Sequence, residues 1–183
     1  MELVPGRSCG DCRACCNWLP IAEPDIHKHG GEDCHHLNAQ GCSIYDSRPD
    51  ICRTWFCGWR YMGHLNDDWR PDRCNILISI EQASPPPGYA NPVVLFMIWR
   101  DIAKIEWPPF LNLVGALVAQ RAPVYLAVPV DMQRVTPRIF LNKMLGDAVA
   151  RRDLQGLMMG LMRAALVGTT TQGAPMDMEK PAG

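Results

Sequence analysis

The feature that most constrains this chain is its distribution of cysteine. All nine cysteines lie in the first 74 of the 183 residues. Eight of them form a pattern that begins C-x-x-C-x-x-C-C: Cys9, Cys12, Cys15, Cys16, Cys34, Cys42, Cys52 and Cys57. A C-x-x-C turn brings two sulfurs within reach of one tetrahedral metal ion. Eight thiolates are enough for two four-thiolate sites, or for one iron–sulfur cluster with cysteines to spare, so we expect a metal-binding protein.

A disulfide scaffold is the main alternative for so many cysteines. It calls for an oxidising compartment and preferably an even cysteine count. The sequence begins Met-Glu-Leu-Val-Pro-Gly, without the basic and apolar regions of a signal peptide. It also contains no apolar stretch long enough to span a membrane. We therefore expect a cytoplasmic protein with reduced thiols and no membrane partner, and the net charge of -1 argues against nucleic acid as a partner.

The chain changes character near residue 74. The first part is rich in loop-forming residues, so bound metal would have to supply part of its folding energy. Apolar periodicity then predicts strands at 76–80, 93–99, 124–128 and 135–141, and helices at 110–120 and 145–166. The expected fold class is α+β. A loop-rich, cysteine-ligated metal module over residues 1–74 precedes a small sheet with two helices over 75–168, and a disordered tail follows over 169–183.

The residues around the later cysteines extend the pattern. The segment from Gly41 to Arg53 has the form G-C-x-I-Y-x-x-R-P-x-x-C-R. Together with C-x-x-C-x-x-C-C, it resembles the CxxCxxCC family of bacterial proteins, which are regarded as zinc- or iron-chelating. The resemblance covers residues 9 to 57 and implies metal binding by all eight cysteines. It implies no settled biochemical activity.

The spacing leaves the metal and the grouping of the cysteines open. With two zinc ions, Cys9 and Cys12 serve one site while Cys15 or Cys16 turns toward the second, because adjacent residues project in different directions. Alternatively, Cys9, Cys12 and Cys15 hold three corners of a [4Fe-4S] cluster and a distant cysteine holds the fourth. The first hypothesis is a zinc- or iron-chelating protein that could also hold a partner protein. The second is an iron–sulfur redox protein or oxidoreductase component, and neither hypothesis assigns a catalytic residue.

Three further groups of residues lie near the pattern. Cys74 falls outside it, and we expect a buried free thiol there. His35 and His36 directly follow a cysteine, but eight available thiolates make a ligand role for them unnecessary. Arg48 and Arg53 lie between ligand cysteines, where they either relieve the negative charge of a thiolate site or pair with nearby aspartates on the surface.

Overall fold

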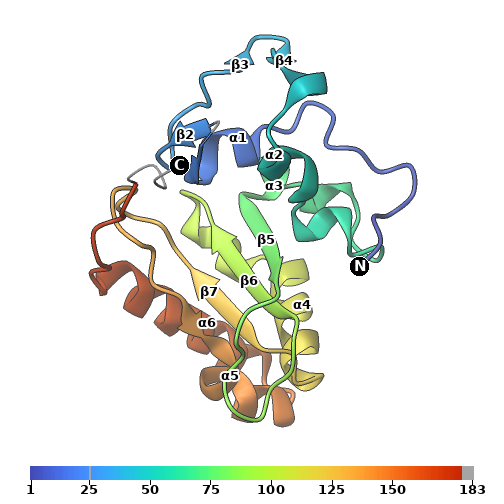
Figure 1. The fold of residues 1–183 in the computed structure, drawn as a ribbon. Coiled ribbons are helices and arrows are strands. Elements are labelled where there is room, and N and C mark those ends of the chain that lie inside the picture. The colour runs from blue at the N-terminus through green and yellow to red at the C-terminus, as the bar shows by residue number, and fades with distance from the viewer. Residues whose placement is uncertain (25, 179–183) are drawn as a thin grey trace.

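The structure is a computed structural model and describes residues 1–24 and 26–178. It combines helices and strands in an α+β arrangement, which confirms the expected fold class. Figure 1 shows the cysteine-rich N-terminal region gathered at one end of the molecule, next to a sheet with helices packed against it. Within the described ranges, no helix is both long and apolar enough to cross a membrane.

Short elements joined by loops build the N-terminal region. Its helices are α1 (Ala14–Trp18), α2 (Asp50–Thr54) and α3 (Pro71–Cys74), with 3₁₀ turns η1 (Tyr45–Ser47), η2 (Gly58–Arg60) and η3 (Asp67–Trp69). Two antiparallel hairpins lie between α1 and α2, formed by β1 (Ile21–Glu23) with β2 (Ile26–Lys28) and by β3 (Leu37–Asn38) with β4 (Gly41–Cys42). Helices of about one turn are not stable by themselves in water, so tertiary contacts must hold these elements.

The main sheet has the strand order β5 (Ile76–Glu81), β6 (Val93–Ile98), β7 (Val124–Ala127) and β8 (Ile139–Phe140). Strands β6 and β7 are parallel because helix α4 (Pro108–Ala119) connects them, and the other pairs are antiparallel. Phe96 of β6 turns toward α4, where its ring meets Phe110 edge to face at 5.2 Å. Since side chains alternate along a strand, Leu95 turns to the opposite face, toward the cysteines.

One hydrophobic core joins the N-terminal region to the sheet. Trp59, Leu65 and Trp69 belong to the same cluster of buried residues as Ile78 and Phe96. In contrast, residues 35–56 contain no buried residue. The expected boundary at residue 74 therefore does not separate two cores, because residues 57–74 pack on the sheet.

Three helices, instead of the two expected, pack with the sheet: α4, α5 (Leu141–Ala150) and α6 (Leu154–Thr170). The single helix expected at 145–166 is divided because Asp153 caps α6, its carboxylate accepting the Gly156 N–H at 2.8 Å. Arg152, with a φ of 55°, reverses the chain just before this cap. The strand expected at 135–141 is reduced to β8 because α5 already begins at Leu141.

Residues 169–178, expected to be part of a disordered tail, have defined partners instead. Helix α6 continues through Thr170, and the segment beyond it pairs with the loop after β7. Val135 donates its N–H to Ala174 O at 2.9 Å, and Met176 donates to Gln133 O at 2.8 Å. The remainder of the expected tail, residues 179–183, lies outside the described residues.

Candidate metal centre

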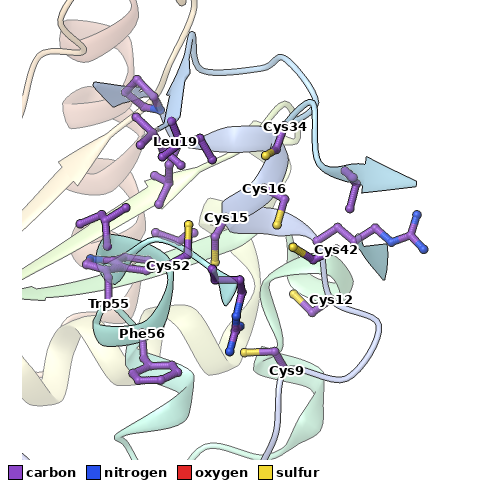
Figure 2. A pocket seen from close by; sticks show the side chains of 18 of the residues that line it. Cys9, Cys12, Cys15, Cys16, Leu19, Cys34, Cys42, Cys52, Trp55 and Phe56 are labelled. Atoms are coloured by element: carbon purple, nitrogen blue, oxygen red, sulfur yellow. The ribbon is translucent and has the colours of Figure 1, made fainter. Parts of the chain in front are cut away.

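Seven of the eight pattern cysteines line one cavity of about 560 Å³ between the N-terminal region and the sheet. Figure 2 shows these seven side chains, which come from α1, α2 and the neighbouring loops, around this common space. The sheet contributes an apolar wall that includes Leu77, Leu95, Met97 and Ala127. The eighth cysteine, Cys57, is 5% exposed and belongs to the hydrophobic core. The fold thus brings together thiols from distant parts of the sequence.

Four of the cysteines form one group, which we call the inner set: Cys9, Cys12, Cys15 and Cys57. Burial raises the pKa of Cys15, and negative charge on nearby thiolates raises it further, in the order Cys57, Cys12, Cys9 and Cys16. Burial also raises the pKa of Cys57, with charge on Cys9 acting in the same direction. Cys12 and Cys9 share a turn in which the Cys12 N–H donates to Cys9 O at 3.0 Å. Burial raises the pKa of Cys12 to about 12.

The remaining four form the outer set: Cys16, Cys34, Cys42 and Cys52. Burial raises the pKa of Cys16, and charge on Cys34, Cys42 and Cys52 raises it further in that order. The pKa of Cys52 is likewise raised by burial and then by charge on Cys34 and Cys42. The main chain supports this grouping, since the Cys34 N–H donates to Cys16 O at 2.9 Å.

Helix α1 carries one cysteine of each set. Cys15 and Cys16 are adjacent on this helix, and adjacent helical residues project about 100° apart. Cys15 therefore faces the inner set while Cys16 faces the outer set. The charges that raise the pKa of Cys15 and of Cys16 thus come mainly from different cysteines.

Burial and mutual repulsion both disfavour the thiolate form in these sets. Each cause raises a thiol pKa, and several thiols crowded together cannot all ionise in the absence of positive charge. A bound cation reverses this balance, because a coordinating thiol loses its proton outright. The sets thus have the electrostatic character of cation sites.

Arg60 places a guanidinium group beside the inner set. Its Nη1 donates to Cys9 Sγ at 3.5 Å, and the group lies 4.9 Å from the Phe56 ring. Its Nε is one of the two buried side-chain polar atoms without a hydrogen-bond partner in the described part of the chain. A buried donor without a partner is costly, so this N–H is available to a thiolate sulfur.

Lys28 is buried beside the outer set, with 5% of its surface exposed. Its Nζ contacts four main-chain carbonyl oxygens, those of Asn17 at 3.1 Å, Leu19 at 2.6 Å, His29 at 3.1 Å and Glu32 at 3.0 Å. Burial lowers the pKa of Lys28, and the charges of Cys34 and Cys16 oppose this effect. A positive charge is therefore fixed next to two cysteines of the outer set.

The arginines and histidines singled out in the sequence have distinct surroundings. Arg53 pairs with Asp50 of α2 on the surface. Arg48 lies over the Tyr45 ring at 3.7 Å, and its charge opposes the rise in the pKa of Cys52 that burial and the neighbouring thiolates cause. The rings of His35 and His36 are tilted to each other with centroids 3.9 Å apart, and only His36 lines the cavity. Arg48 is thus the arginine of this pair that faces the cysteines.

Cys74 lies apart from both sets. It is 2% exposed in the hydrophobic core, and its sulfur accepts the Ile76 N–H at 3.3 Å. Burial raises its pKa to about 11. These surroundings match the buried free thiol expected from the sequence.

The donor chemistry of the two sets suits a thiophilic metal, since all nine cysteines are free thiols. As positioned, however, no three or more histidine, cysteine, aspartate or glutamate side chains of residues 1–24 and 26–178 form a group that could hold a metal ion.

Sequence reasoning did not identify Lys28 or Arg60. Lys28 lies in β2 between two histidines, in a stretch with the polar composition of a surface strand. Arg60 ends a single 3₁₀ turn, and nothing in its neighbours indicates burial of the guanidinium nitrogen. Both roles arise from contacts with residues distant in the sequence.

No family model, no curated protein and no solved structure matches this chain. The resemblance to the CxxCxxCC family therefore depends on the motif residues alone.

Proposed function

We propose that this chain binds two thiophilic metal ions, zinc or iron, one at the inner set and one at the outer set. The observation that carries the proposal is the convergence of seven of the motif's free thiols on one cavity, with the eighth, Cys57, close enough for the charge of Cys9 to act on it. Four thiolates are a common ligand set for zinc and for iron. Two such groups account for every cysteine of the motif and leave out Cys74, which is buried elsewhere.

The buried cations support the same proposal. Four thiolates around a divalent ion carry a net charge of about -2, which is costly to bury without compensation. Arg60 lies beside the inner set and Lys28 beside the outer set. Each set therefore has its own source of positive charge.

The lack of core in residues 35–56 also supports the proposal. These residues contribute Cys42 and Cys52 to the outer set, yet none of them is buried. When bound, a metal ion supplies cross-links between segments, and such cross-links contribute directly to folding free energy. Metal ligation would thus add to the few hydrophobic contacts of this part of the chain, of which Trp55 against the core is one.

Elemental analysis of protein purified without oxygen tests the proposal. We expect about two zinc ions per chain in a colourless protein, or iron in a coloured one, to match the two four-thiolate groups. Iron with acid-labile sulfide and visible charge-transfer absorption would identify the iron–sulfur redox protein that the sequence offers as the alternative. Cys74→Ser is the matched control and should keep the full metal content. A fully reduced chain that takes up neither Zn²⁺ nor Fe²⁺ would refute metal binding.

A further inference from the structure

The inner set is anchored to the core on both of its chain segments. Arg7, just before Cys9, lies with its guanidinium 4.7 Å from the Trp59 ring and donates to Leu65 O at 2.6 Å. On the other segment, Cys57 is 5% exposed within the core cluster. The cysteines of the inner set are therefore positioned by contacts that do not depend on a metal.

Half of the outer set has only a weaker anchor, the partly buried Trp55, which packs against the core. Cys42 and Cys52 come from residues 35–56, which we call the arm and which contain no buried residue. The hairpin of β3 and β4 pairs only two residues on each strand, and α2 has no buried side chain. A segment with so few buried contacts opens locally at low free-energy cost.

The other half of the outer set is preformed. Cys34 N–H donates to Cys16 O at 2.9 Å, and Gly31 N–H donates to Asn17 O at 2.8 Å, so two chain segments lie side by side. Lys28 clamps the same segments, because its Nζ contacts carbonyl oxygens on both of them. Cys16 and Cys34 thus stay together whether or not the arm is in place.

Lys28 affects this half through its charge and its position. An ammonium group has three N–H donors, and carbonyl oxygens occupy all of them, so none remains for a sulfur atom. The ion pairs between described residues do not include Lys28. A buried charge that forms no ion pair is stabilised by nearby anions, which here are the carboxylates of Glu32 and Asp33, and a metal-bound thiolate group would be a further one.

We propose that the outer set is an exchangeable site for a divalent thiophilic ion, and that Lys28 is the positioning residue on which this site is assembled. The ion first meets the preformed pair of Cys16 and Cys34, and the arm then closes over it with Cys42 and Cys52. The outer ion can leave while the inner ion stays bound. This inference rests on the proposed function, and it makes the two sites unequal.

Titration of the full-length, metal-free protein with Cd²⁺ tests the inference, because cadmium–thiolate absorption reports each site. We expect two steps of different affinity, the weaker of which a chelator reverses first. Cys42→Ser/Cys52→Ser should abolish the weaker step alone. Lys28→Met should weaken that same step by roughly 10- to 100-fold, as loss of a group that supports metal ligands usually does. Lys143→Met, which removes an exposed lysine of α5, is the control and should change neither step.

Each other outcome has a definite meaning. One cooperative step, or equal weakening of both steps in Lys28→Met, would refute the separation of the sites. An unchanged titration of Lys28→Met would refute the role of the lysine. If Lys28→Met does not fold, the double cysteine variant still decides separability. Absence of any cadmium–thiolate absorption in the parent protein would instead refute the proposed function.

Hydrogen exchange gives a second readout, since removal of the outer ion should expose amides of the arm and leave those near Cys9 and Cys57 protected.

Discussion

Gly58 links the sheet to the inner set, and its replacement by alanine tests this link. Gly58 directly follows Cys57, and a Cβ atom at this position would lie 2.5 Å from Ile78 Cγ2 and 2.8 Å from Ile78 Cβ. Carbon atoms normally approach to about 3.5–4.0 Å, so η2 or β5 must shift by roughly 1 Å. Overpacking of this kind costs about 1–3 kcal/mol, while the lower backbone entropy of alanine in the unfolded chain returns about 0.4–1 kcal/mol. We expect a net loss of about 1–2 kcal/mol in the free energy of unfolding.

Urea unfolding of the metal-free protein, followed by tryptophan fluorescence, measures this loss. Gly146→Ala is the matched control, because nothing lies within 4 Å of a Cβ atom there and the position is inside helix α5. It should stabilise the protein by about 0.5–1 kcal/mol. Ile78→Ala removes the Cγ2 atom, so the double variant Gly58→Ala/Ile78→Ala should lose less than the sum of the two single losses.

The proposed metal binding provides a second measurement on the same variant. Displacement of η2 moves Cys57 and Arg60, so Gly58→Ala should weaken the stronger Cd²⁺ step and leave the weaker step unchanged. If Gly58→Ala is stabilised like the control, or if only the weaker step changes, then η2 does not fix the inner set against the sheet.

Three further predictions concern other parts of the molecule. Asn142→Ala removes the hydrogen bonds to Val124 N at 2.8 Å and to Ala122 O at 2.7 Å, so unfolding in urea should show a loss of about 2–3 kcal/mol, whereas an unchanged midpoint would contradict this pairing. Burial raises the folded-state pKa of Cys74 from 9.0 to about 11. The protonated thiol therefore contributes its full stabilisation of the folded state below pH 9, and this contribution is lost as the pH rises to about 11. Urea midpoints of metal-free protein should therefore fall across this window, less steeply in Cys74→Ala, and an equal slope would count against burial of the thiol. Chelation followed by limited proteolysis should cut within residues 35–56 while the sheet survives, and equal resistance with and without metal would refute metal-dependent order in the arm.

Local patterns predict the sheet better than they predict the helices beside it. The alternation of Ile76, Ile78 and Ile80 predicts β5, although both faces of the strand are covered, since Leu77 and Ser79 are buried as well. Apolar spacing does not predict the break between α5 and α6, since apolar residues continue at helical spacing on both sides of it. Only Asp153 indicates the break, through its capping hydrogen bond to Gly156, and a single capping residue is a weaker signal than a long apolar periodicity.

The candidate site shows the same division between local and distant information. Spacing identifies the eight cysteines and predicts that Cys15 and Cys16 face different ways, because both facts are local. The assignment of Cys34, Cys42 and Cys52 to one group depends on how loops fold over α1, which no short motif encodes. The role of Lys28 is even harder to predict, because its four partners are main-chain carbonyl oxygens. Every residue has such an oxygen, so no residue type in the sequence indicates the contact.

The apolar wall of the cavity has a consequence for the order of events during synthesis. The wall is built by β5, β6 and β7, all of which follow the last motif cysteine in the sequence. Since a ribosome releases the N-terminal part of a chain first, the eight thiols emerge before the strands that cover them. Nascent chains thus pass through an interval in which both sets are open to solvent, where capture of the proposed metal ions and oxidation would compete for the same sulfurs.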